Sequence, residues 1–115
     1  MSSDPGTKVR DELIRLLDDV AWRIAKSARR TAYPILRAMG QMPTDCAMIE
    51  HITRLLRMGF PFHEVPLGEP PGSAGTGYVM NNADGQGLYI KVKIERERTD
   101  DVVVLSFHVS DHYKG

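Results

Sequence analysis

The first half of the chain carries apolar residues at the spacing of helices. They recur in steps of three and four, which places them on one face of an amphipathic helix. The set comprises Val9, Leu13, Leu16, Leu17, Val20, Ile24 and Ala28. This pattern predicts one long helix that starts with Asp4 as N-cap and Pro5 in its first turn, and that ends or kinks at Pro34.

Two more helices are predicted before residue 60. The stretch "YPILRAMG" indicates a short helix closed by Gly40. The stretch "MPTDCAMIEHITRLLRMG" indicates a helix capped near Thr44 or Asp45 and stopped by Gly59. Its inward-facing side chains would be Met48, Ile49, Ile52, Leu55 and Leu56.

The second half changes from helical spacing to the alternation that is typical of strands. Residues 60–77 are rich in proline and glycine, which predicts a loop. Three strand patterns follow, "GYVMNN", "LYIKVKIE" and "VVVLSFHV", with short turns between them. We therefore expect an α+β fold in a single domain, residues 1–115. Helices over residues 5–59 would pack on one face of a small antiparallel sheet of about three strands, residues 77–110.

Side chains of the predicted sheet divide into two faces. In the middle strand, Leu88, Ile90, Val92 and Ile94 alternate with Tyr89, Lys91, Lys93 and Glu95. In the last strand the more apolar set is Val103, Leu105, Phe107 and Val109, opposite Val102, Val104, Ser106 and His108. Because the helices can bury only one face, we expect Ser106 and His108 on the side of Lys91 and Lys93. Tyr78 of the first strand would join them unless a bulge reverses its side.

Composition narrows the class of protein. The chain has 115 residues, with 15 basic and 15 acidic side chains and zero net charge, which counts against strong phosphate binding and DNA binding. No apolar run approaches the length of a membrane span, and "MSSDPGTKVRDEL" lacks the apolar core of a secretory signal. The single cysteine, Cys46, is expected to be a buried, inert thiol. We expect a cytoplasmic protein without a cofactor.

Basic residues also gather in the helical half. Arg23, Lys26, Arg30 and Arg37 are predicted on one helical side. Such a stripe is either a solvated face or a contact surface for RNA or for an acidic partner helix. His51 is expected to be a half-buried structural histidine. His108, Asp111 and His112 find no third ligand at metal-binding spacing, so no metal site is expected.

The polar face of the sheet has two interpretations. It could be the solvated back of an antiparallel sheet. Alternatively, it could cleave phosphodiesters without a metal, which requires a base, an acid and cations for the phosphorane charge. Histidine titrates near neutral pH, so His108 could transfer a proton. Lys91 and Lys93 could hold phosphate, and Tyr89 or Tyr78 could stack on a base.

A family resemblance favours the second interpretation. "LYIKVKI" followed by "VVVLSFH", within residues 88–108, resembles the C-terminal strand pair of the motility-quorum-sensing-regulator toxins. In that pattern a Tyr-x-Lys strand precedes an apolar strand ending in Ser-Phe-Lys, and His108 stands where the lysine would be. The resemblance implies the compact α+β fold shared by RelE-like and barnase-like nucleases, metal-independent cleavage of single-stranded mRNA, and neutralisation by an antitoxin.

This hypothesis assigns a role to each residue of the face. The catalytic residues would be His108, Lys91 and Tyr89, and the substrate-binding residues would be Lys93, Ser106 and Tyr78. The alternative is a non-catalytic protein-binding module such as an antitoxin, an immunity protein or a phage-encoded inhibitor. Zero net charge and the lack of a paired acid/base motif favour that alternative, which would leave RNA intact.

Overall fold

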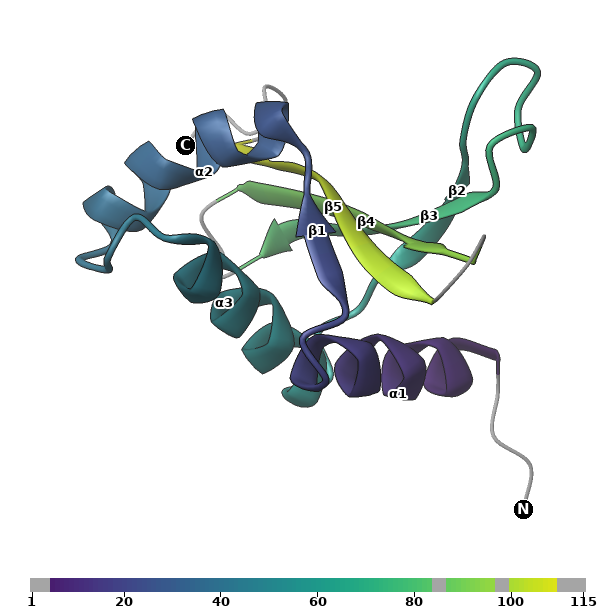
Figure 1. Cartoon of the computed structure of the whole chain (residues 1–115), viewed down its shortest axis with the longest axis horizontal. Coiled ribbons are helices and arrows are strands. Elements are labelled where there is room, and N and C mark those ends of the chain that lie inside the picture. The colour runs from purple at the N-terminus through teal and green to yellow at the C-terminus, as the bar shows by residue number, and fades with distance from the viewer. Residues whose placement is uncertain (1–4, 84–86, 97–99, 110–115) are drawn as a thin grey trace.

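Three helices and five strands make up the described part of the chain (Figure 1). The computed structural model describes residues 5–83, 87–96 and 100–109, so Asp4, Asp111 and His112 lie outside the described residues. The elements are α1 (Pro5–Asp18), β1 (Trp22–Ile24), α2 (Lys26–Ala38), α3 (Asp45–Arg57), β2 (His63–Pro66), β3 (Thr76–Ala83), β4 (Leu88–Glu95) and β5 (Asp101–Val109). No helix within these ranges is long and apolar enough to span a membrane.

The strands form one mixed sheet in the order β1-β5-β4-β3-β2. β1 is parallel to β5, and the other neighbours are antiparallel. The predicted α+β class is confirmed. The expected antiparallel sheet of about three strands was wrong in its size and in its strand directions. β1, which is parallel to β5, comes from the predicted helical half, and β2 comes from the predicted loop.

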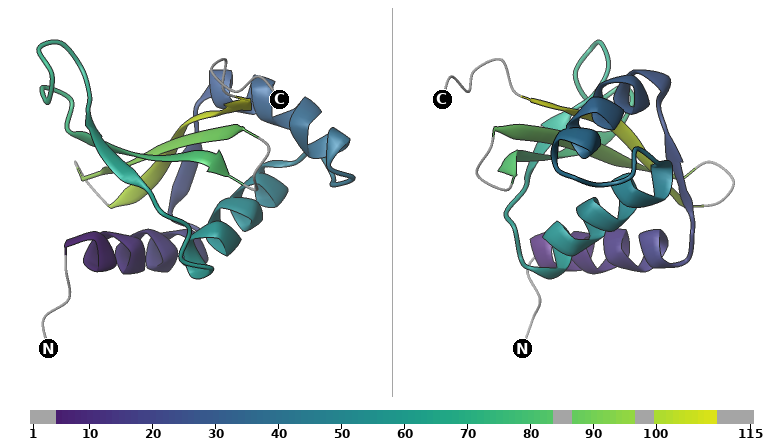
Figure 2. Two further views of the ribbon diagram at one scale, coloured as in Figure 1. Left: turned by 180° about the vertical axis from the view of Figure 1, so that it is seen from behind. Right: turned by 90° about the vertical axis from the view of Figure 1, so that its left-hand side faces the viewer.

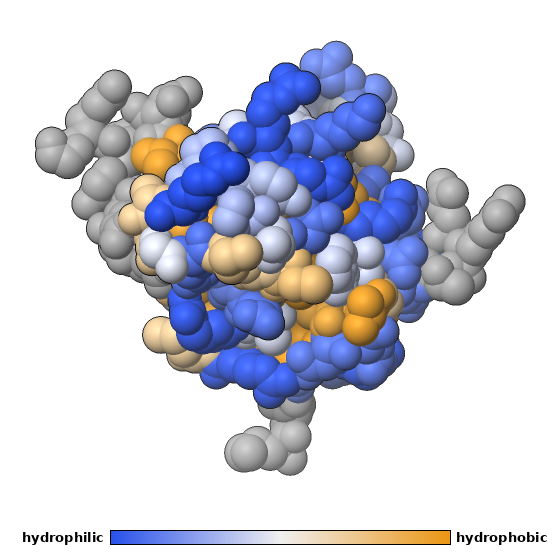
Figure 3. Space-filling model, turned by 60° about the vertical axis from the view of Figure 1, so that its left-hand side comes forward, coloured by the Kyte–Doolittle hydropathy of each residue, from blue (hydrophilic) through white to orange (hydrophobic). Residues whose placement is uncertain are grey.

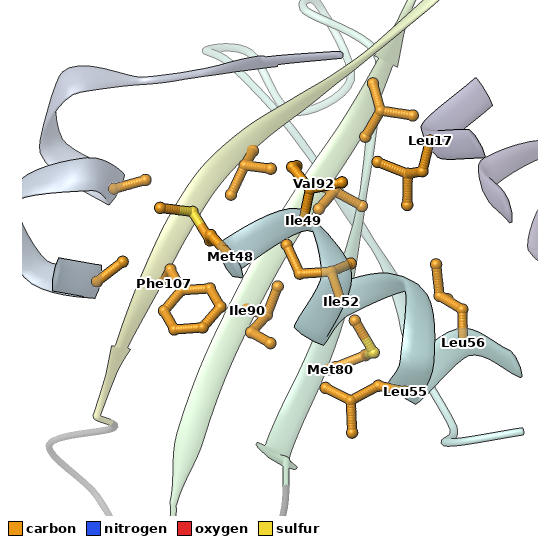
Figure 4. Close-up of a cluster of buried hydrophobic side chains, with 14 of the residues drawn as sticks. Leu17, Met48, Ile49, Ile52, Leu55, Leu56, Met80, Ile90, Val92 and Phe107 are labelled. Carbon is orange, nitrogen blue, oxygen red and sulfur yellow. The ribbon is translucent and has the colours of Figure 1, made fainter. Parts of the chain in front are cut away.

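The helices are arranged around one face of the sheet. α1 and α3 lie together on that side (Figures 1 and 2). Between them and the sheet is a continuous apolar core, which includes Leu17, Met48, Ile52, Ile90 and Phe107 (Figure 4). We call the opposite side of the sheet the open face.

α2 protects part of one sheet edge. β1 pairs only with Val102–Val104, so the second half of β5 has β4 on one side and no strand on the other. The Thr31 hydroxyl of α2 donates a hydrogen bond of 2.6 Å to the Phe107 carbonyl in that half. A helix that satisfies an edge strand in this way blocks edge-to-edge association.

The predicted long first helix was wrong, because the chain leaves helical geometry after Asp18. The Ala21 N–H donates to the Leu16 carbonyl and the Val20 N–H to the Leu17 carbonyl, which is the Schellman pattern of a helix end. β1 follows, held by hydrogen bonds from Val102 N–H to the Ala21 carbonyl and from Ala25 N–H to the Val104 carbonyl. Pairing with β5, which is far away along the chain, therefore determines that residues 22–24 are extended.

Pro34 was predicted to end or kink a helix, and it does not end one. It lies inside α2, exposed, and the predicted short second helix is the last part of α2. Proline removes one helical hydrogen bond, but the fully buried Ala32 and Leu36 on either side hold this segment against the core.

The predicted α3 is confirmed: Thr44 caps it by accepting from the Ala47 N–H at 3.1 Å, and Gly59 follows its end with φ +83°.

β2 lies inside the stretch that was predicted to be a loop. It pairs with β3, with His63 opposite Val79 and Pro66 opposite Thr76. Arg10 of α1 anchors the segment before it, because the guanidinium donates to the Leu56 and Phe60 carbonyls at 3.0 and 2.9 Å. Proline is tolerated in β2 because the strand is at the sheet edge.

A β-bulge divides β5 and changes which side chains are buried. Lys91 is opposite Ser106, but Val92 is opposite Val104, so Leu105 is the extra residue. Val102, Val104 and Phe107 consequently all enter the core, each with 0% exposure. The predicted inward set was therefore wrong for Val103 and Leu105, because strict alternation does not continue across a bulge.

Val20 offers a direct test of the helix end. Its φ is +60°, and its side chain is 71% exposed, so a β-branched residue occupies a left-handed position without compensating burial. Val20→Gly should raise the free energy of unfolding by about 0.5–1 kcal/mol, since relief of the left-handed strain exceeds the entropy cost of glycine. Urea denaturation measures this, with Val20→Ala as a control that keeps a Cβ. Equal stability of the glycine and alanine variants would contradict it.

Candidate active site on the open face of the sheet

Three cross-strand rows of side chains line the open face. The first row is His108, Tyr89 and Asn81, and the second is Ser106, Lys91, Val79 and His63. The third row is Val103, Lys93, Gly77 and Val65. The prediction that Ser106 and His108 share a face with Lys91 and Lys93 is confirmed.

Tyr89 and His108 lie near one end of the open face, one residue from the start of β4 and one residue from the end of β5. They are directly opposite each other on β4 and β5, and their rings are stacked with centroids 5.0 Å apart and planes inclined by 21°. His108 Nδ1 lies 2.9 Å from the Val109 carbonyl oxygen. A carbonyl can only accept, so Nδ1 carries the proton, and Nε2 of the neutral ring is left as the acceptor. In this tautomer Nε2 is the nitrogen that could act as a general base.

Lys91 and Ser106 lie in the adjoining row. They are a directly opposed pair, and Lys91 is diagonal to His108, a separation of roughly 7–8 Å. Lys91 forms none of the ion pairs or hydrogen bonds found among the described residues. Its side chain is half-buried, and Lys91 is directly opposite Val79, which is only 1% exposed. The site therefore has one uncompensated positive charge beside the histidine.

Lys93, unlike Lys91, has a carboxylate partner. Its ammonium lies 2.7 Å from a Glu95 carboxylate oxygen, and this hydrogen bond holds the pKa of Glu95 below its ordinary value. A phosphate bound by Lys93 would have to displace that carboxylate. Of the two predicted phosphate ligands, Lys91 is thus the one available for an anion.

Tyr78 does not join the face, so its expected position there was wrong. It is paired with Val92 and lies on the helix side of the sheet, edge-to-face against Phe62 at 5.7 Å. Burial, with the nearby Glu64 charge, raises the pKa of its hydroxyl. β3 pairs without irregularity from Gly77 to Asn81, so the register of the strand, and no bulge, determines its side.

The four residues of the predicted basic stripe do not lie on one helix. Arg23 belongs to β1, on the open face, with its guanidinium 4.0 Å from Asp101. Lys26, Arg30 and Arg37 are all exposed on α2. The helical prediction was wrong for Arg23 because the chain is a strand at that point.

The sequence reasoning missed two polar residues of the face. His63 is in the row of Lys91, and Asn81 is directly opposite Tyr89. The available signal was the alternation of Phe62 and Glu64 with His63 and Val65. The surrounding prolines and glycines favoured a loop instead, so this strand was not predicted.

Two other sequence expectations concern Cys46 and His51. Cys46 is exposed, so the expectation of a buried thiol was wrong, because the residue lies on the outward side of the first turn of α3. His51 was expected to be half-buried but is only 2% exposed, with its ring edge-on to Phe107 and Nδ1 2.8 Å from Arg54, because its side of α3 faces the core. Within residues 5–83, 87–96 and 100–109, no three His, Cys, Asp or Glu side chains gather as a metal site would require.

A cleft of about 620 Å³ lies away from Tyr89 and His108. The chain between β2 and β3 lines it together with the end of β4, including Lys93 and Arg96. Arg96 is held by both Glu12 oxygens at 2.7 Å and by Asp100 at 2.9 Å, and these contacts raise the pKa of Arg96 and lower that of Glu12. Because carboxylates already hold both cations, we place the candidate chemistry at Tyr89 and His108 instead.

Comparison with known proteins does not narrow the possible functions further. No family model, curated protein or solved structure matches this chain. Its function is therefore inferred from the geometry of the open face and from the strand-pair resemblance.

Proposed function

We propose that this protein cleaves single-stranded RNA without a metal ion, and that it is the toxin of a toxin–antitoxin pair. The observation that carries the proposal is the stacked Tyr89–His108 pair, with the uncompensated Lys91 in the next row. Tyr89 and Lys91 belong to the Tyr-x-Lys strand that resembles an mRNA-cleaving toxin family, and His108 stands where that family has a lysine. The antitoxin partner follows from that resemblance.

The proposed chemistry is attack of a ribose 2′-hydroxyl on the adjacent phosphorus. His108 Nε2 takes the hydroxyl proton as the O2′–P bond forms, and the P–O5′ bond breaks to leave a cyclic phosphate. The Lys91 ammonium stabilises the charge on the phosphorane and gives a proton to the departing O5′. The diagonal separation of His108 and Lys91 allows one ribose–phosphate unit to lie between them.

Other residues of the open face would bind and orient the RNA. Ser106 can donate a hydrogen bond to a phosphate oxygen beside Lys91. Tyr89 keeps the His108 ring in place by stacking. Asn81 and His63 continue the two rows toward β2, where they could contact neighbouring nucleotides.

The test is cleavage of a long mixed-sequence RNA in excess chelator. Wild type should produce fragments with cyclic-phosphate ends, and Lys91→Ala should lower the rate by about 10²–10³-fold because the phosphorane loses its cation. Lys8→Ala is the matched control, since Lys8 is an exposed lysine of α1 without an ion pair. It should cleave at the wild-type rate. Intact RNA with wild type would contradict the proposal and favour the protein-binding alternative.

A further inference from the structure

A row of three cations follows the outward side of α2. Lys26, Arg30 and Arg37 are separated by four and seven residues, which places them on one side of the helix. The buried residues of α2 are Ala28, Ala32 and Leu36, on the opposite side. We call Lys26, Arg30 and Arg37 the α2 row; it points directly away from the core.

Nothing among the described residues neutralises the α2 row. Arg15, Arg23, Arg29, Arg57, Lys93 and Arg96 all have a carboxylate partner. Arg10 and Arg54 have hydrogen bonds instead. Within the described ranges, the cations with neither kind of partner are Lys8, Lys91 and the three of the α2 row. Of these five unpartnered cations among the described residues, three are thus on one helix face.

The sequence of α2 contributes to this charge. "KSARRTAYPILRA" contains four basic residues and no acidic residue. Its fourth cation, Arg29, is bound to both Asp45 oxygens at 2.9 Å, and Tyr33 donates to the same carboxylate at 2.7 Å. This cluster ties α2 to α3 and lowers the pKa of Asp45. Figure 3, which looks toward α2 and α3, shows a strongly hydrophilic surface over its upper part.

We propose that the α2 row docks an acidic helix of a protein partner. Lys26 and Arg37 are eleven residues apart, about 16 Å of helix, and carboxylates on a facing helix can match the spacings of the row. RNA is the less suitable ligand, because the hollow of about 300 Å³ that Lys26 and Arg30 line with Arg29 and Tyr33 does not extend to Arg37. Single-stranded RNA also needs exposed aromatic rings, whereas the nearby Tyr33 is half-buried and hydrogen-bonded to Asp45.

This inference is independent of the nuclease proposal. The α2 row lies on the outer side of a helix, whereas Lys91 and His108 lie on the open face of the sheet. Loss of partner binding and loss of RNA cleavage can therefore be measured separately.

The probe is an alanine-rich helical peptide with glutamates at the i, i+4 and i+11 spacing of the α2 row. A second peptide has glutamines at these positions, and polyuridylate serves as the nucleic-acid probe. Each is titrated into the full chain by amide NMR at low salt. We expect the glutamate peptide to shift α2 resonances and the glutamine peptide to leave them unchanged.

Charge variants test whether the α2 row is the binding site of the glutamate peptide. Arg30→Glu should weaken binding of the glutamate peptide by at least about tenfold, and Arg30→Gln less. Lys8→Glu has the same charge change at another unpaired exposed cation and should weaken it by less than about twofold, because screening limits distant charges. Equal losses in Arg30→Glu and Lys8→Glu, no binding of the glutamate peptide, or shifts of α2 caused by polyuridylate alone would overturn the proposal.

Discussion

His108→Ala should lower the rate of RNA cleavage by about 10²–10⁴-fold, the usual contribution of a positioned proton-transfer group. The reason is the tautomer of the His108 ring, which determines the nitrogen that can accept a proton. With Nδ1 engaged by the Val109 carbonyl, Nε2 is the one ring nitrogen free to take the 2′-hydroxyl proton. The measurement is the initial rate with a fluorescent single-stranded RNA in excess chelator.

Two further variants separate chemistry from binding and folding. His108→Gln keeps polar contacts but cannot transfer a proton, so its rate should be as low as that of His108→Ala while RNA binding is retained. Ser106→Ala, on the same strand and face, should lose much less, since its hydroxyl only adds a hydrogen bond. Wild-type rates in His108→Gln would remove the histidine from the mechanism.

Phe107→Ala should lower the free energy of unfolding by about 3–5 kcal/mol, a large part of the stability of a small domain. Phe107 is fully buried, and Figure 4 shows its ring next to Ile90 and close to Met48. Its removal leaves a cavity where β5, β4 and α3 meet. Guanidinium denaturation followed by circular dichroism measures the loss.

Leu105→Ala is the matched control, because alternation along the sequence places Leu105 and Phe107 on the same face. The bulge places Leu105 outside the core, and its side chain is only half-buried. Leu105→Ala should therefore cost about 1 kcal/mol, well below the range of a buried leucine. Similar losses for the two variants would mean that β5 has no bulge at this position.

Elements with a strong local signal were predicted from the sequence. α3 has its apolar stripe, its Thr44 cap and its terminal Gly59 within one continuous segment. β4 alternates without interruption over eight residues. Alternation in the sequences of β4 and β5 therefore predicts that Tyr89, Lys91, Ser106 and His108 share one face.

Elements whose conformation depends on distant partners were not predicted. β1 has apolar residues at helical spacing, but hydrogen bonds to β5, about eighty residues away along the chain, make it a strand. β2 has prolines and glycines around it, and pairing with β3 orders it. Tertiary context overrides weak local propensity in such short segments.

By itself, the sequence determined the α+β class, the polar side of β4 and the grouping of His108 with Lys91, because side-chain alternation is a local property of an extended chain. The tertiary structure alone decided the five-strand order, the bulge at Leu105, the position of Tyr78 on the helix side and the separation of Arg23 from the α2 row. These features depend on register and on hydrogen bonds between distant segments, which no local pattern specifies.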